Sequence, residues 1–465
     1  MQTQQEQPKA WRGYLALWAA KIARRGLRLL GKRATQVPGR IALKIEPNFL
    51  SWIQKPEKRF GITGTNGKTT TTNMIASICE ANGLRTACNR FGSNLKSGIC
   101  SALIVETSWR NRTKADALIV EVDEVSSPTY LPQLRLQGLL VTNLFRDQYE
   151  RIGHVGQLVR RLNQAITDEV VLILNGDDVQ QRRLGTERNR RLWYRVSDDP
   201  EGDAGKLLQA WICPACHEPM EVLHQQYQTI GRYRCPICGK ENPKAHYEIT
   251  SFSPEAGQLH FKMTDMEPSE ERVFYFPIRQ TFDLYNLCAV LSAVDFLGLS
   301  WETAQNVLSS YRSFQVRYEQ ESFGAYRVTK MLNKGKTPAS ISHVLYYAAH
   351  HGPSTLILLD QDFGQAPQGY HNMAWLYDAD FSAASDPAIR DIVVCGARFL
   401  DYDIALRLQH TPMEKVHCFR TIDEAAELIV KLPCKNLCLT YDLDDYSIEQ
   451  GRALWNRIKE SVHEN

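Results

Sequence analysis

The sequence predicts an α/β protein with a parallel sheet in a central domain, a small cysteine-bearing ribbon inserted into that domain, and a second α/β domain toward the C-terminal end. Continuous apolar runs of strand length alternate with helical stretches, the pattern of parallel strands that helices cover on both faces. A glycine-rich turn lies between a strand and a helix at residues 60–72, and two C-x-x-C pairs interrupt the alternation after residue 205. At 465 residues the chain has the length of about three domains.

Composition sets further limits. The net charge is only +3, which gives no general affinity for polyanions, so we expect no nucleic-acid partner. Twelve cysteines without a secretory signal favour a reducing cytosol, and we expect a cytoplasmic protein.

Residues 1–50 are expected to form a basic N-terminal helix and a lead-in to the central domain. No Asp or Glu occurs between residues 7 and 45. Residues 11–30 have helical periodicity: one face carries Trp11, Leu15, Trp18, Ile22 and Leu29, and another carries Lys21, Arg25, Arg28 and Lys32. Basic residues interrupt the apolar run too often for a membrane span. The helix therefore either lies peripherally on an anionic membrane surface or packs on its own domain with its arginines in water. Residues 37–50 are expected to be extended.

The segment FGITGTNGKTTTT at residues 60–72 predicts a site for a nucleoside triphosphate, between a strand ending at residues 59–63 and a helix at residues 71–81. Glycines let the backbone approach the phosphates, while successive N–H groups and the helix N-terminus point at the anion. Lys68 can reach the terminal phosphates and Thr69 can ligate Mg²⁺. The expected nucleotide-binding residues are Gly64, Thr65, Asn66, Gly67, Lys68, Thr69 and Thr70. The alternative is an ordinary turn with a surface lysine.

Acidic residues follow the strand at residues 118–123, which reads LIVEVD. A carboxylate at this strand end can hold Mg²⁺ opposite the loop. Glu121 is the first candidate, Asp123 and Glu124 are the other two, and a strand-end cap is the alternative for each. His154 can serve a second metal ion or a phosphate, unless it is a solvated loop histidine.

Further strands are expected at residues 139–143 and 170–175. Ligands bind at the carboxyl ends of such parallel strands, where polar residues gather here.

A zinc ribbon is expected at residues 205–243. Cys213-Pro-Ala-Cys216 and Cys235-Pro-Ile-Cys238 have eighteen residues between them, a spacing typical of a Zn²⁺ site. Four thiolates close a tetrahedral site, so the metal would be structural. A redox disulfide is the alternative.

Residues 51–320, including the ribbon, are expected to form the central domain, and residues 321–465 the C-terminal α/β domain. The central domain should end with strand-like sequence at residues 247–262 and 272–277 and a helix at residues 283–297. The expected strands of the second domain are at residues 355–359, 391–395 and 436–440.

The loop T-G-T-N-G-K-T-T resembles that of the Mur ligase superfamily, the ATP-dependent amide-bond ligases of cell-wall precursor synthesis and their folate-polyglutamylating relatives. TNLFRDQYERIGH looks like their Asn-x-x-x-Asp motif. TFDLYNLCAVLSAV is similar to their asparagine-bearing helix at the base of the adenine pocket, which implies that Asn286 lies there. SFQVRYE is similar to their G-R-x-E element, which implies Arg317 as a phosphate contact.

One subgroup, the MurT ligase subunits of lipid II isoglutaminyl synthase, joins a Mur-like domain to a four-cysteine ribbon. The segments PGRIALKIEPNFL, FGSNLKSGI, VEVDE, CPIC and WLYDADF follow the order of that subgroup. The resemblance implies ATP-dependent amidation of the α-carboxyl of D-glutamate in the lipid II stem peptide, through an acyl phosphate, with Lys68 and Glu121 among the catalytic groups.

The same resemblance implies a heterodimer with a GatD-like glutaminase that supplies ammonia. An aspartate of the C-terminal domain would complete the Cys-His pair of that partner. Asp378 in WLYD is the first candidate, with Asp360 and Asp362 in reserve.

Two other classes of function stay open on the sequence alone. One is a Mur- or folylpolyglutamate-type ligase that adds an amino acid, against which the ribbon counts. The other is a non-enzymatic zinc protein that binds a nucleotide.

Overall fold

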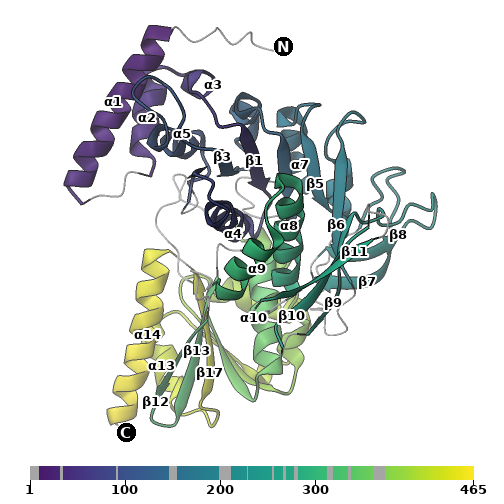
Figure 1. The fold of residues 1–465 in the computed structure, drawn as a ribbon. Coiled ribbons are helices and arrows are strands. Elements are labelled where there is room, and N and C mark those ends of the chain that lie inside the picture. Colours follow the sequence, from purple (N-terminus) through teal and green to yellow (C-terminus); the bar gives the residue numbers. More distant parts are fainter. Residues whose placement is uncertain are drawn as a thin grey trace.

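The computed structural model describes residues 10–31, 35–90, 93–145, 154–197, 211–227, 229–253, 256–264, 269–276, 281–311, 318–333, 337–360, 372–442 and 444–464. Two separate sheets, each flanked by helices, and a small two-stranded ribbon make up the protein (Figure 1). The α/β fold class predicted from the sequence is confirmed.

The central sheet has nine strands in the order β11-β10-β9-β6-β5-β4-β1-β3-β2. The strands from β2 to β9 are parallel, and β10 and β11 continue the sheet antiparallel. In chain order the strands are β1 (Lys58–Thr63), β2 (Thr86–Cys88), β3 (Ala117–Glu121), β4 (Gly138–Val141), β5 (Val171–Asn175), β6 (Arg191–Val196), β9 (Tyr247–Ser253), β10 (Gln258–Met263) and β11 (Glu270–Tyr275). The sequence missed β2 and β6.

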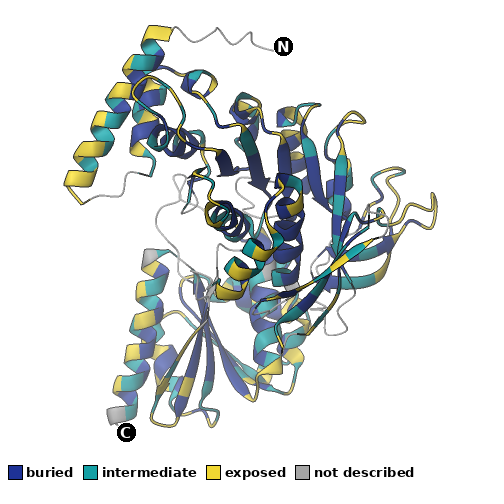
Figure 2. Cartoon of the chain, viewed as in Figure 1, coloured by how far each residue is buried: buried dark blue, intermediate teal, exposed yellow. Residues whose placement is uncertain are grey.

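Both faces of this sheet are buried, as its continuous apolar strands require. In β4, Leu140 faces one core while Leu139 and Val141 face the other. The first core is closed by α4 (Lys68–Ala81), α8 (Thr281–Leu297) and α9 (Trp301–Ser310). The second is closed by α1 (Ala10–Leu29), α2 (Val37–Ile45), α3 (Phe49–Trp52), α5 (Lys96–Val105), α6 (Leu131–Leu134) and α7 (Val155–Ala165). Figure 2 shows the strands dark blue between helices whose outer faces are exposed.

The C-terminal sheet has six strands in the order β12-β13-β17-β14-β15-β16, all parallel except β12. They are β12 (Tyr318–Phe323), β13 (Tyr326–Asn333), β14 (Ser354–Leu359), β15 (Ile389–Cys395), β16 (Val416–Phe419) and β17 (Asn436–Asp442). One face packs on α10 (Pro338–His350), α11 (Ala374–Tyr377) and α12 (Phe399–Leu408), and the other packs on α13 (Ile422–Ile429) and α14 (Asp445–Glu464). Single 3₁₀ turns are η1 (Ser127–Thr129), η2 (Val179–Arg183), η3 (Ser382–Ser385) and η4 (Met413–Lys415).

The expectation of an extended lead-in at residues 37–50 was wrong, because α2 and α3 occupy most of it. Pro38 lies in the first turn of α2, where proline is tolerated since its missing N–H has no intrahelical partner there. Gly39 makes a close approach to α5: its N–H donates to Ser101 Oγ at 2.8 Å, and a Cβ at this position would lie 1.8 Å from Ser97 O. Tertiary packing thus selects the helix.

The predicted N-terminal helix is confirmed as α1, but it packs on the domain through an unexpected face. Its buried residues are Gly13, Ala16, Leu17 and Ala20. Gly13 abuts the Trp52 ring, and Tyr14 meets that ring edge-on with 5.0 Å between centroids. The large apolar residues of the stripe predicted from the sequence point outward (Figure 2). Among the described residues, no helix is long and apolar enough to cross a membrane.

Gly39→Ala is expected to lower the free energy of unfolding by about 1–3 kcal/mol, the usual cost of overpacking a well-packed contact. Gly26→Ala in α1 is the matched control, because nothing lies within 4 Å of a Cβ built there. The control should gain about 0.5–1 kcal/mol from helix propensity. Urea denaturation of both variants checks this, and an unchanged midpoint for Gly39→Ala would contradict the close packing of α2 on α5.

Candidate functional site

The glycine-rich loop connects β1 to α4 and is pressed against two neighbouring elements. Gly64 and Gly67 have φ values of +125° and +82°, in the region that side chains disfavour. A Cβ on Gly64 would lie 2.2 Å from Thr142 Oγ1, after β4, and one on Gly67 would lie 2.2 Å from Asn286 Oδ1, on α8. Both positions therefore require glycine, and Asn286 lies against the loop. Its place at the base of the adenine pocket stays a prediction.

Asn143, directly after β4, holds the loop by three hydrogen bonds. Its carbonyl accepts from Thr65 N at 2.8 Å and its Oδ1 accepts from Asn66 N at 2.8 Å. Its Nδ2 donates to Asn66 O at 3.1 Å. Sequence comparison with the family placed Asn143 in a motif but assigned it no role. Position 147, the Asp of that motif, lies outside the described residues.

Lys68 is the first residue of α4, three residues before the predicted start. Its ammonium contacts Gly64 O, donates to Thr65 O at 3.1 Å and pairs with Glu124 Oε1 at 2.7 Å. Burial raises the pKa of Glu124, and the ammonium of Lys68 opposes that rise. The ammonium of Lys68 thus contacts loop carbonyls and one buried carboxylate.

Thr69 and Glu121 lie side by side opposite the loop. Thr69 Oγ1 donates to Glu121 Oε2 at 2.8 Å, and Asn94 Nδ2 donates to Glu121 Oε1 at 3.1 Å. Adjacent ligands of an octahedral Mg²⁺ lie about 3 Å apart, since each bond is 2.0–2.1 Å. The two oxygens therefore fit neighbouring positions around Mg²⁺. Asp123 instead accepts from Ser126 N and Ser126 Oγ at 2.9 and 2.7 Å, as a turn cap does.

The remaining predicted residues of this site differ in placement. Thr70 lies in the first turn of α4 and is half-buried. His154 is exposed at the N-terminus of α7, where its Nδ1 accepts from Gly156 N at 3.0 Å. His154 therefore caps a helix, and only Nε2 could face a ligand. Arg317 lies outside the described residues.

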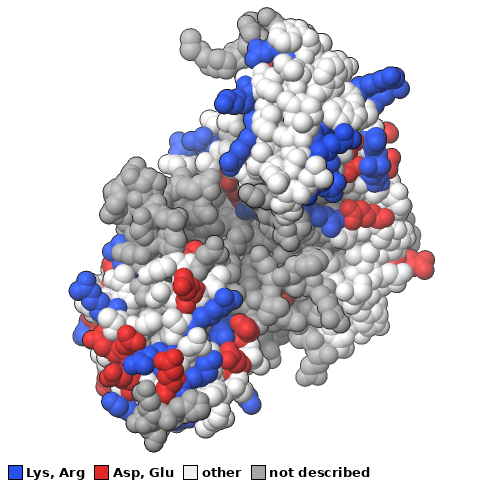
Figure 3. Space-filling view, turned by 90° about the vertical axis from the view of Figure 1, so that its left-hand side faces the viewer, with Lys and Arg blue, Asp and Glu red and all other residues white. Residues whose placement is uncertain are grey.

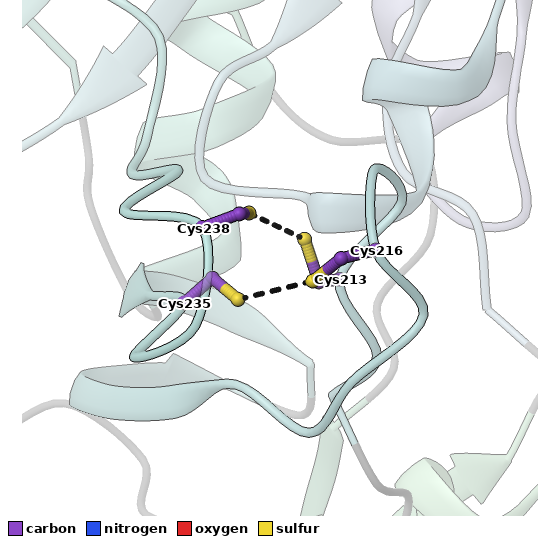
Figure 4. A group of neighbouring side chains, drawn as sticks. All are labelled: Cys213, Cys216, Cys235 and Cys238. Carbon is purple, nitrogen blue, oxygen red and sulfur yellow. Dashed lines mark hydrogen bonds between the residues drawn. The ribbon is translucent and has the colours of Figure 1, made fainter.

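The four predicted zinc ligands come together. In the described part of the chain, Cys213, Cys216, Cys235 and Cys238 are the one group of at least three potential metal ligands, and their Sγ atoms all lie within 4.8 Å of one another (Figure 4). Zn–S bonds of about 2.3 Å at tetrahedral angles place sulfurs about 3.8 Å apart. The sulfurs of Cys213 and Cys238 are 3.5 Å apart, so the cage fits zinc.

The two halves of the cage have the same backbone. His217 N donates to Cys213 O at 2.9 Å, and Gly239 N donates to Cys235 O at 2.9 Å. His217 and Gly239, which follow the second cysteine of each pair, both have positive φ. Each C-x-x-C is therefore a tight knuckle that aims two thiols inward.

The ribbon strands β7 (Glu221–Tyr227) and β8 (Ile230–Arg234) lie in the connection between β6 and β9. Asp177, in the turn after β5, anchors this insertion: its carbonyl accepts from Gly231 N, and its Oδ1 accepts from Asn242 Nδ2, both at 3.0 Å. Its Oδ2 accepts from Tyr285 OH at 2.8 Å. Because Tyr285 precedes Asn286 on α8, one carboxylate joins the ribbon to the helix beside the loop.

The candidate aspartates of the C-terminal domain lie in different surroundings. Asp378 ends α11 and is half-buried. Asp360 follows β14, is 7% exposed and is hydrogen-bonded by the side chain of Tyr402. Asp362 lies outside the described residues.

Comparison with known sequences identifies the family. The Mur ligase middle domain matches residues 62–206, and the MurT ligase C-terminal domain matches residues 331–443. The chain is 30% identical over 401 residues to the lipid II isoglutaminyl synthase (glutamine-hydrolyzing) subunit MurT of Staphylococcus aureus strain COL, covering 85% of this chain and 88% of that protein. This chain belongs to the MurT family. The MurT subunit of Streptococcus pneumoniae strain ATCC BAA-255 / R6 is 24% identical over 425 residues, or 91% of this chain and 92% of that protein.

Solved structures support the fold of this MurT-family chain. A pseudomurein peptide ligase type C from Methanothermus fervidus has a TM-score of 0.64 at 16% identity, over 89% of this chain and 81% of that one. MurF from Thermotoga maritima, solved in complex with ADP, has a TM-score of 0.52 at 12% identity, over 92% and 85% of the two chains. The predicted resemblance to Mur ligases and their MurT subgroup is confirmed.

Metal analysis of this MurT-family protein, purified under reducing conditions, is expected to find about one Zn²⁺ per chain. Cys235→Ser should lose most of that zinc and lower the melting temperature, because ligand binding contributes to folding free energy. Cys434→Ser, which removes a thiol outside the cage, should keep both. Equal zinc content in the two variants would remove the assignment.

Proposed function

We propose that this chain is the ligase subunit of a glutamine-dependent amidotransferase. It uses ATP and Mg²⁺ to activate the α-carboxyl of D-glutamate in the lipid II stem peptide, and ammonia converts the activated group to D-isoglutamine. Two observations support the proposal. Lys68 contacts the glycine-rich loop while Thr69 is hydrogen-bonded to Glu121, and the chain aligns over most of its length with a lipid II isoglutaminyl synthase subunit. We place the reaction in the cytoplasm, where ATP is available.

Activation is needed because a carboxylate would have to expel oxide. Phosphoryl transfer to its oxygen replaces that leaving group by phosphate, through an acyl phosphate that ammonia then attacks. The protein contributes mainly positioning and charge neutralisation. Lys68 would exchange Glu124 and the loop carbonyls for phosphate oxygens. Backbone N–H groups between Gly64 and Thr70 would point at the phosphates, apart from those of Thr65 and Asn66, which donate to Asn143.

Thr69 and Glu121 would hold Mg²⁺, whose charge offsets that of the phosphates when it is bound. Asn94 would fix the Glu121 carboxylate by its hydrogen bond. We further propose Asn286 for the base of the adenine pocket and Arg317 as a phosphate contact. Because Nδ1 accepts from Gly156 N, the neutral ring carries its proton on Nε2, so His154 would donate to a phosphate there and could bind a second metal ion only if the cap were lost.

Ammonia would come from a glutaminase subunit, because free ammonia is mostly protonated at neutral pH and then not nucleophilic. We propose that Asp378 completes the Cys-His pair of that partner. Asp378 is half-buried at the end of α11, whereas Asp360 is almost fully buried and accepts from Tyr402. The more accessible carboxylate is the better candidate for contact with another subunit. The zinc cage, closed by four thiolates, would be structural.

Lys68→Ala is expected to lower ATP-dependent amidation of lipid II by about 10²–10³-fold, the typical cost of removing one group that stabilises transition-state charge. Lys244→Ala, which removes an exposed lysine, is the control and should keep full activity. The assay follows phosphate release and D-isoglutamine in the presence of the glutaminase subunit. Near-normal turnover with unchanged folding would exclude Lys68 from the site.

Asp378→Asn is expected to reduce glutamine-dependent amidation by about 10²- to 10⁴-fold, since an amide cannot stabilise an imidazolium. Activity with concentrated ammonium salt at raised pH should remain, because the ATP site is untouched. Asp423→Asn, an exposed aspartate on α13, is the control and should keep both activities.

A pull-down with the glutaminase subunit must show that Asp378→Asn still binds its partner. Equal loss with both nitrogen donors would assign Asp378 to the ligase site or to the fold. If neither activity falls, Asp360→Asn and Asp362→Asn are the next variants to measure.

A further inference from the structure

The outer face of α1 is an exposed apolar surface on a helix that is firmly attached to its domain. Its exposed fractions are 65% for Trp11, 47% for Leu15, 46% for Trp18, 64% for Ile22 and 89% for Leu29. These side chains recur at helical spacing, so they form one continuous stripe, which we call the outer stripe. Contiguous apolar surface of this kind on a soluble domain marks an interaction site.

The domain does not need this stripe for its own core. Small residues on the opposite face of α1, with Leu17, make the contact with α2, α3 and α5. Trp18 Nε1 donates to Trp109 O at 2.9 Å, which satisfies its polar atom while leaving much of the ring in solvent. The outer stripe is therefore held in a fixed orientation and has no partner among the described residues.

Positive charge borders the outer stripe. Along one margin, the Arg25 guanidinium lies 5.0 Å and the Lys21 ammonium 5.6 Å from the Trp109 ring centroid. Arg24 and Arg28 on α1 and Lys114 before β3 belong to the same group of charges. Arg110 and Arg112 follow Trp109, whose carbonyl accepts from Trp18, in the same connection. Figure 3, which faces α1, shows a pale strip of helix surface with blue residues on both sides.

Few acids offset this charge, although Glu106 acts on both Lys21 and Arg24. No Asp or Glu occurs between residues 7 and 45. Burial, and then the charges of Arg24 and Lys114, lower the pKa of Lys21 to about 8, while the carboxylate of Glu106 opposes the shift. A second copy of this face would bring like charges together, so self-association is disfavoured.

We propose that the outer stripe docks on an anionic phospholipid surface, with α1 lying in the plane of the membrane. Tryptophans and aliphatic side chains would enter the boundary between headgroups and acyl chains, and the basic margin would contact lipid phosphates. Insertion of apolar side chains and attraction of basic side chains to lipid phosphates are both needed, because either one alone gives weak and reversible binding. Docking depends only on α1 and its basic margin. The proposal is therefore independent of which carboxylate the ATP site activates.

The test is flotation of the full chain with vesicles. The protein should float with vesicles of phosphatidylglycerol and phosphatidylcholine, remain below vesicles of phosphatidylcholine alone, and be released by high salt, which screens surface charge. Trp11→Ser combined with Ile22→Ser and Leu29→Ser should lower the partition by more than about tenfold, as the loss of three inserted side chains predicts. These three residues are highly exposed, so the melting temperature should not change.

The matched control is the exposed apolar stripe of α12, formed by Leu400, Ile404 and Leu408, which are 61%, 47% and 65% exposed. Acidic Asp401 and Asp403 lie on that helix, so the same triple change to Ser there should leave flotation intact. Arg28→Glu with Arg110→Glu should weaken binding to the anionic vesicles and leave the fold unchanged.

Equal flotation by the α1 variant and the parent protein would overturn the proposal, as would equal binding to both kinds of vesicle. A concentration-dependent dimer in sedimentation, lost in the α1 variant and accompanied by no flotation, would assign the stripe to a second copy instead. Loss of flotation with retained ATP hydrolysis supports docking and separates it from the proposed reaction.

Discussion

The parallel register of β1 between β3 and β4 is the constraint on which the site depends. Ile62 pairs with Glu121 and Thr63 pairs with Val141, so the three strands end at one edge of the sheet. The loop leaves β1 at that edge and meets Glu121 on one side and Asn143 on the other. A register slip of one residue would turn these side chains to the opposite face. The apolar packing of the sheet in its two cores fixes this register. The hydrogen bonds of Lys68 and Thr69 therefore depend on that packing more than on any single polar contact.

The ribbon is inserted at a point where it interrupts no strand pairing of the central sheet. β6 and β9 pair directly in parallel, with Tyr194 opposite Tyr247, and the whole ribbon lies in their connection. Parallel neighbours always need a crossover, so an excursion of this length costs no additional strand pairing. The C-terminal sheet is also mostly parallel, and helices bury it in two cores of its own. Each half of the chain can therefore bury its own apolar surface.

Much of this organisation could be predicted from the sequence, and the failures have physical causes. Three local signals were confirmed. Continuous apolar runs form parallel strands, the glycine-rich segment forms a loop between a strand and a helix, and the four spaced cysteines come together. The helix at residues 37–45 was missed because Pro38 and Gly39 are residues that usually break helices. Only the close contact of Gly39 with Ser97 explains why a helix forms there. The sequence pattern marked only the large apolar residues of α1 as one face, whereas close packing on the domain uses Gly13 and Ala16. The pairing of Lys68 with Glu124 joins residues far apart in sequence, and no local pattern reports which of three neighbouring acids turns toward the lysine.

Asp177 joins the proposed zinc ribbon to the helix beside the proposed nucleotide loop, so the two ligands would be linked through one structure. It holds the ribbon by two hydrogen bonds and Tyr285 by a third, and Tyr285 adjoins the asparagine that touches the loop. If the ribbon binds zinc as proposed, loss of the metal would loosen those two bonds and leave α8 with a less fixed neighbour. Linkage is reciprocal, so a nucleotide that orders α8 must tighten zinc binding by the same factor. The cell's zinc supply would then set, in a small and graded way, how readily this protein engages ATP.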